Sequence, residues 1–149
     1  ITGRVRDEKG NPLEAEIEWQ DLDSGMSLGN LKSKAGTGEF FIALPIGRHY
    51  AYFAKKSGFF SQSQSLDTSG EKTFQTREME ISLVSIQEAK NTGTEVNLNN
   101  ILFQSDSADL DKRSYSELER LIEVLKKNPG LRIEIQGHTS ASNRPESMN

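Results

Sequence analysis

The sequence lacks cysteine altogether, which excludes disulfides, thiolate zinc sites and cysteine nucleophiles. It has two histidines, His49 and His138, far apart in the chain. The motifs of serine hydrolases, phosphate-binding loops and zinc peptidases are missing, and no apolar run approaches the roughly 20 residues that span a bilayer. We therefore expect no enzyme activity, no cofactor and no metal site.

The sequence also lacks an excess of positive charge. The formal net charge is −4 and the sequence pI is about 5.3. Residues 1–86 hold 10 Lys+Arg and 12 Asp+Glu, and residues 87–149 hold 8 and 10, so each half is near −2. A nucleic-acid binder needs a basic stripe to neutralise phosphates. We therefore expect no nucleic acid as a partner.

Short strands separated by turns are the pattern of residues 1–86. Expected strands cover 1–6, 15–19, 39–44, 49–54 and 74–84, and the Gly-, Ser- and Asp-rich stretch 21–30 predicts a loop. Repeated short strands with Gly/Pro turns favour a β-sandwich. Its predicted core includes Trp19, Phe40, Phe41 and Tyr50, while His49 is expected to be structural or solvated.

The periodicity changes after the polar stretch 87–95, which predicts a linker. Residues 96–98 and 101–103 predict one apolar strand, and a helix with one apolar stripe follows. The sequence Ser114-Tyr115-Ser116-Glu117 has the form of a capping box. Asn128-Pro129-Gly130 ends the helix, and residues 131–136 alternate as a strand should. Residues 96–149 therefore predict a partial α/β unit of β-α-β order, which makes two domains.

Two segments give this second unit a family resemblance. Residues 100–110 resemble the first strand and loop of OmpA-like domains, and Ile133-Glu134-Ile135-Gln136-Gly137-His138-Thr139 resembles the I-x-G-H-T-D segment of that family. The resemblance covers about residues 95–149. The chain starts at Ile1 rather than Met and stops at Asn149, so we interpret it as a fragment whose OmpA-like domain is incomplete.

The resemblance implies a domain that binds the peptide stem of peptidoglycan noncovalently. In relatives that grip diaminopimelate, an Asp after Gly-His-Thr takes the ammonium and an Arg on the next helix takes the carboxylate. Here Ser140 stands where that Asp is expected, and Asn149 matches the residue that opens the helical segment. The family-equivalent positions are Phe103, Gly137, His138, Thr139, Ser140 and Asn149.

Each of these positions has a plainer interpretation beside the ligand-binding one. His138 is more often a strand-end histidine bonded to backbone, Gly137 more often serves a tight strand exit, and Phe103 is expected in the core. Thr139 and Ser140 lie where the family pocket sits, and pocket-lining and structural roles stay open for them. Three aspartates, Asp106, Asp109 and Asp111, are spaced like calcium ligands but lack the Gly of an EF-hand loop, so a solvated loop is favoured.

The first half has a resemblance of its own. Residues 3–7, 10–13, 38–40 and 46–50 resemble a carboxypeptidase regulatory-like domain, a transthyretin-like β-sandwich found in envelope and secreted proteins. Such a sandwich placed before an OmpA-like domain implies a cell-envelope protein on the periplasmic side of the outer membrane. The expected role is anchoring through peptidoglycan. The alternative is a structural scaffold in an outer-membrane complex, with outer-membrane proteins as partners and no diaminopimelate binding.

Overall fold

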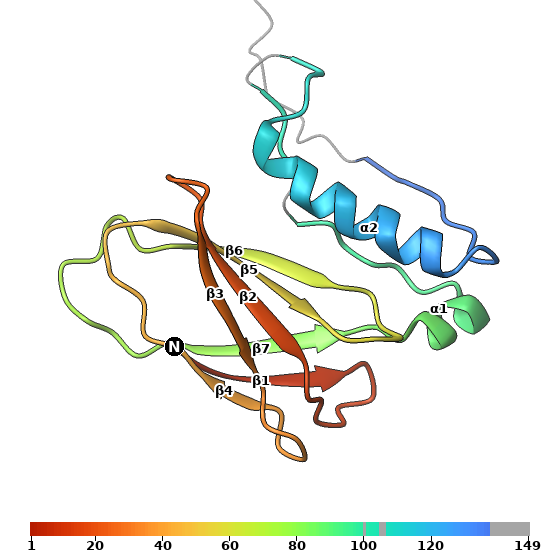
Figure 1. The fold of residues 1–149 in the computed structure, drawn as a ribbon, viewed down its shortest axis with the longest axis horizontal. Helices are drawn as coiled ribbons and strands as arrows, with labels where there is room; N and C mark the ends of the chain where they lie inside the picture. The colour runs from red at the N-terminus through yellow and green to blue at the C-terminus, as the bar shows by residue number, and fades with distance from the viewer. Residues whose placement is uncertain (100, 105–106, 138–149) are drawn as a thin grey trace, which may run out of the picture.

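The computed structural model describes residues 1–99, 101–104 and 107–137 (Figure 1). These residues form two β-sheets and two α-helices. The strands are β1 Thr2–Asp7, β2 Glu16–Asp21, β3 Ser27–Lys32, β4 Glu39–Phe41, β5 His49–Lys55, β6 Gln62–Asp67 and β7 Glu78–Leu83. The helices are α1 Ile86–Thr92 and α2 Tyr115–Lys127, the latter preceded by a 3₁₀ turn, η1 Lys112–Ser114.

The two sheets pack face to face, as the sequence predicts for a β-sandwich. One sheet has the order β4-β1-β7 and the other β3-β2-β5-β6. β1 pairs antiparallel with β4 but parallel with β7, and all pairs in the larger sheet are antiparallel. A single cluster of buried side chains from both sheets fills the space between them.

Strict alternation in β2 builds the centre of this core. Ile17 and Trp19 are fully buried, while the alternating residues Glu16 and Glu18 are only partly buried. The Trp19 ring meets the Tyr52 ring of β5 at 5.2 Å between centroids, with the planes tilted by 47°. Burial raises the pKa of the Tyr52 phenol to about 12, so it stays neutral and its hydroxyl donates to Gln64 Oε1 at 2.8 Å.

Gly38 is a position where only glycine fits. Its φ is +68°, and a Cβ there would lie 2.2 Å from the carbonyl oxygen of Val5. This close approach lets the Val5 amide donate to the Gly38 carbonyl at 2.8 Å. The 36–38 turn is therefore fastened to the middle of β1.

Two strands of the larger sheet escaped the sequence patterns. The loop expected at 21–30 is a short turn followed by β3, and β6 had no prediction at all. Both strands are polar, and most of their residues are exposed or half-buried. As edge strands they are set by hydrogen bonding to β2 and β5 rather than by hydrophobic alternation.

Strand β4 is shorter than the expected 39–44, and one predicted core residue is wrong. Phe40 is buried, but Phe41 is 69% exposed. Neighbouring residues in a strand point to opposite faces, so two adjacent phenylalanines cannot both enter the same core.

The polar segment 87–95, expected as a linker, is largely helical. Helix α1 has Ser85 as its N-cap, whose side chain accepts a hydrogen bond from the Glu88 amide. Gly93, with φ +67°, ends the helix. These end signals were present in the sequence, but the stretch lacks the apolar stripe on which helix prediction relied.

The predicted helix of the second unit is confirmed as α2, but its capping box is wrong. The Ser114 hydroxyl makes no capping bond. It instead accepts from the Leu102 amide at 2.7 Å and donates to the Leu102 carbonyl at 3.0 Å. The serine therefore ties the helix start to the preceding segment.

The strands expected at 96–98, 101–103 and 131–136 are not formed. Among the described residues of 96–103 there is only an isolated β-bridge, between Phe103 and Leu110. Residues 131–136 form no strand and pair with no other strand. The backbone groups of Leu102 are used by Ser114 and by the Asp111 amide, so no neighbouring strand pairs with them. Ile133 and Ile135 are exposed. An alternating pattern needs a partner strand, and none pairs with it among the described residues.

Candidate functional site

The predicted ligand-binding positions fall only partly within the described structure. Phe103 is 59% exposed, so its expected core position is wrong, and Gly137 is exposed as well. His138, Thr139, Ser140 and Asn149 lie outside the described residues. The arrangement that the OmpA resemblance implies for these six positions therefore remains a prediction.

A compact turn supports Phe103. The Gln104 amide donates to the Asp109 carbonyl and the Asp111 amide donates to the Leu102 carbonyl, both at 2.9 Å. The Ser107 hydroxyl donates to the Asp109 carboxylate at 3.0 Å. Asp109 thus takes part in local turn contacts, as the solvated-loop interpretation requires. Across the described residues, no group of three His, Asp or Glu side chains could hold a metal ion.

Helix α2 lies over the outer face of the larger sheet (Figure 1). The Arg120 guanidinium sits 3.4 Å from the centroid of the Phe53 ring of β5. Its Nη2 lies 3.5 Å from Glu18 Oε2 of β2, and its Nη1 donates to the Ser116 carbonyl at 2.9 Å. One arginine therefore joins the helix to two strands of the sandwich.

Glu117 is the buried titratable group of this contact, with only 2% of the residue exposed. Burial raises the pKa of its carboxyl, and the Ser63 hydroxyl of β6 and the charge of Arg120 partly oppose that effect. Glu117 Oε2 and Ser63 Oγ are buried without a hydrogen-bond partner of good geometry within the described chain. This pair was not predicted from the sequence, because Glu117 stands at the position of a capping-box glutamate.

A second charged cluster holds one end of the sandwich. Arg48 Nη1 lies 2.6 Å from the carboxylate of Asp21, a residue that is 1% exposed, and this hydrogen bond holds the pKa of Asp21 below its ordinary value. His49 lies between two carboxylates, with Nδ1 2.9 Å from Asp23 and Nε2 3.3 Å from Asp67. The hydrogen bond to Asp23 and the charge of Asp67 raise the pKa of His49. The histidine is therefore structural, as the sequence analysis favoured.

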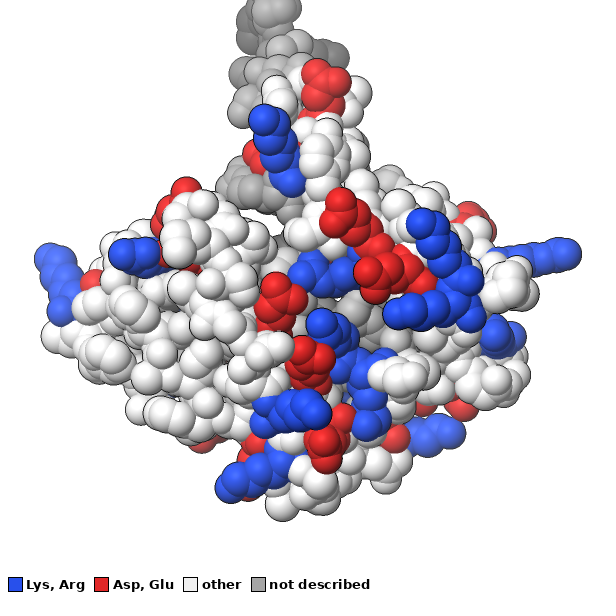
Figure 2. All heavy atoms as spheres, viewed as in Figure 1, with Lys and Arg blue, Asp and Glu red and all other residues white. Residues whose placement is uncertain are grey.

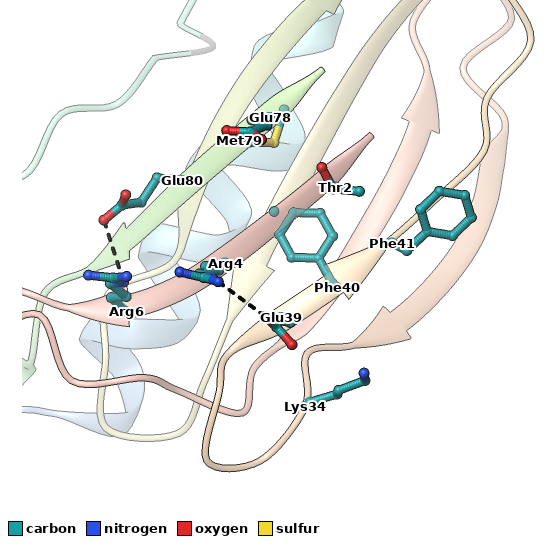
Figure 3. Close-up of a pocket in the computed structure, with 11 residues that line it drawn as sticks. Thr2, Arg4, Arg6, Lys34, Glu39, Phe40, Phe41, Glu78, Met79 and Glu80 are labelled. Carbon is teal, nitrogen blue, oxygen red and sulfur yellow. Dashed lines mark hydrogen bonds and ion pairs between the residues drawn. The ribbon is translucent and has the colours of Figure 1, made fainter. Parts of the chain in front are cut away.

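A shallow concavity of about 630 Å³ lies on the outer face of the smaller sheet (Figure 3). Two of its three basic residues, Arg4 and Arg6, are paired with Glu39 at 3.2 Å and with Glu80 at 3.7 Å, and the third is Lys34. Phe41 is exposed at its rim. Because the charges compensate one another, the surface selects no ligand of a particular sign.

Charge is mixed elsewhere too. Figure 2 shows acidic and basic side chains intermingled on the viewed face, with no continuous basic stripe there. Among the described residues, no helix has the length and apolar character required to cross a membrane.

A known protein family matches the C-terminal third of the chain. The model of the OmpA family matches residues 102–149. This match supports an OmpA-like domain at the C-terminal end, as the motif resemblance predicted, and with it a peptidoglycan-binding, cell-envelope role at the level of the family. OmpA family domains are typically non-catalytic.

The remaining comparisons add little. None of the curated proteins matches the chain. Among solved structures, a crystal structure of 3-chlorocatechol 1,2-dioxygenase from Rhodococcus opacus 1CP is similar, with 12% identity and a TM-score of 0.41. The similar region covers 57% of this chain and 58% of that chain. At that TM-score the likeness carries no argument about fold or chemistry.

Proposed function

We propose that this chain belongs to a non-catalytic cell-envelope protein whose complete OmpA-like domain binds peptidoglycan noncovalently and anchors its parent. The observation that carries the proposal is the OmpA family match over residues 102–149. Helix α2, formed between its predicted start and stop, supports it. The expected site of action is the periplasmic side of the outer membrane.

The proposed ligand is the peptide stem, and the proposed contacts are the family-equivalent positions. Thr139 and Ser140 would line the pocket, with His138 and Gly137 shaping its loop and Phe103 and Asn149 at its edge. The proposed function does not require any protein group to form or break a covalent bond. Binding by these positions would rest on hydrogen bonds to a zwitterionic ligand, since none of them carries a fixed charge.

The proposed domain organisation is a carboxypeptidase regulatory-like sandwich over residues 1–86, a connector over 87–95 and the OmpA-like unit from 96 to 149. The two-sheet architecture of β1 to β7 supports the first part. The second is supported by the family match.

Co-sedimentation with purified sacculi tests the anchoring role, using protein that contains the complete OmpA-like domain. We expect the protein to pellet with sacculi at low salt and to stay in solution without them. Protein that remains in the supernatant in both cases would remove the anchoring function.

The alternative is a scaffold in an outer-membrane complex, bound to other proteins there. Ser140 motivates it, since a hydroxyl cannot supply the charge with which an Asp takes an ammonium group. Under this alternative, native protein does not sediment and Ser140→Asp creates binding. Ser142→Asp is the matched control, because it adds the same charge two residues away. Strong sedimentation of the native protein would remove the motive for the scaffold.

A further inference from the structure

Strand β5 is buried on both of its faces. Tyr50, Tyr52 and Ala54 point into the sandwich core, and the alternating residues Ala51 and Phe53 are 0% and 2% exposed on the opposite face. A continuous apolar run of this kind is typical of a strand covered on both sides. The outer face of the larger sheet therefore carries apolar side chains that another part of the chain covers.

The residues beneath that cover form a row across three strands. Glu18 of β2 pairs with Phe53 of β5, and Phe53 pairs with Ser63 of β6. Cross-strand neighbours on one face lie about 5 Å apart. The row thus offers a carboxylate, an aromatic ring and a hydroxyl side by side.

Helix α2 presents a matching face to this row. Glu117, Arg120 and Val124 follow at i, i+3 and i+7 and so lie on one side of the helix. Arg120 meets Phe53 and Glu18, while Glu117 lies against Ser63. The Asn99 side chain adds a hydrogen bond of 2.9 Å to the Ser63 carbonyl.

The apolar stripe of α2 lies on the neighbouring side. Its members are Leu118, Leu121, Ile122 and Leu125. Ile122 is 47% exposed, and the three leucines are half-buried. A helix normally buries such a stripe. Here the contacts with the sandwich come from Glu117 and Arg120 on the polar side, and Ile122 of the stripe stays exposed.

We propose that the row Glu18–Phe53–Ser63 is a docking surface for the polar face of α2, through which the sandwich holds the OmpA-like unit in one fixed orientation. The sandwich is then a positioning platform and not a flexible spacer. The docking involves only contacts inside the chain and does not depend on peptidoglycan binding, so either proposal can fail without the other.

A distance measurement between two spin labels tests the docking. The chain has no native cysteine, so Leu28→Cys on β3 and Glu119→Cys on α2, both exposed, accept labels without interference. We expect a single narrow distance distribution in the doubly labelled protein that carries no other substitution. Arg120→Glu places two carboxylates together at Glu18 and should broaden it.

Two further variants make the result specific. Lys126→Glu changes charge by the same amount on the exposed side of α2 and should leave the distribution narrow. The exchange Glu18→Arg with Arg120→Glu should narrow it again. Emission from Trp19, the single tryptophan, verifies in each case that the sandwich is folded.

A broad distribution in the parent would overturn the proposal, as would an Arg120→Glu variant that stays narrow. An exchange that stays broad would contradict the assigned pairing of Arg120 with Glu18.

Discussion

The sandwich and the C-terminal region differ in how they bury their side chains. In the described chain, every buried hydrophobic side chain lies between Val5 and Ile86. Beyond Ile86 the buried residues are polar, Ser114 and Glu117. The exposed large hydrophobics of that region are Leu102, Phe103, Tyr115, Ile122, Ile133 and Ile135.

This difference separates local from nonlocal structure. Helix α2 forms in both the prediction and the structure, since its hydrogen bonds close within four residues of the chain. A strand such as the one expected at 131–136 has to find its partner elsewhere. Every strand of the sandwich is paired with a neighbouring strand. In the described C-terminal region the helix forms, and it contacts the sandwich.

The largest expected effect is on the sandwich itself. Gly38→Ala adds a Cβ that would meet the Val5 carbonyl at 2.2 Å and forces alanine to positive φ. We expect a loss of about 3 kcal/mol in the free energy of unfolding, measured by urea denaturation with Trp19 emission. Gly36→Ala, also at positive φ but with open space, should lose about 1 kcal/mol. Equal losses for the two would contradict the close approach.

The next effect compares two phenylalanines on the outer faces of the two sheets. Phe53 is 2% exposed beneath α2, and Phe41 is 69% exposed on the uncovered sheet. Phe53→Ala should cost about 2 to 3 kcal/mol in the same urea experiment, because covered apolar surface is lost. Phe41→Ala should change stability by less than about 0.5 kcal/mol. Equal effects would mean that α2 does not cover Phe53 in solution.

A smaller effect is the pH dependence of docking that Glu117 causes. Its pKa is raised by burial, so the docked state favours the protonated carboxyl. The stabilisation is therefore fully present below the ordinary value of 4.5 and is lost as pH rises through the raised pKa. Glu117→Gln should strengthen docking at pH 7 and make it independent of pH, as followed by the two-label distance distribution. A variant that docks more weakly than the parent at pH 7 would contradict this assignment.

The smallest effect is expected at His49, which is half exposed. Its pKa is raised by the Asp23 hydrogen bond and the Asp67 charge, so its stabilising contribution is present below 6.5 and lost as pH rises past the raised pKa. The Tm of the parent should therefore fall slightly across that interval. His49→Gln should flatten the change. A Tm that rises with pH through His49 titration would reverse the assigned sign.

Sequence reasoning succeeded where the pattern was local and hydrophobic. The alternation of Ile17 and Trp19 located β2, and Pro129-Gly130 located the end of α2. It failed for β3 and β6, whose polar residues carry no alternation, and for Ser114, whose hydroxyl bonds Leu102 instead of the helix. The docking row could have been suspected from the unbroken apolar run of β5, which predicts a second covered face.

The candidate site depended on a different kind of information. Phe103, Gly137 and Ser140 were chosen by family resemblance, and neither charge nor periodicity distinguishes them from ordinary loop residues. The OmpA family match over 102–149 agrees with the segment chosen.

The central claim is that peptidoglycan binds to the C-terminal region and not to the sandwich. An NMR titration of protein containing the complete OmpA-like domain with soluble peptidoglycan fragments that carry diaminopimelate tests it directly. We expect saturable amide shifts confined to the OmpA-like domain, including the 137–140 segment, with residues 2–83 unchanged. Shifts centred on the sandwich, or none at saturating ligand, would contradict it.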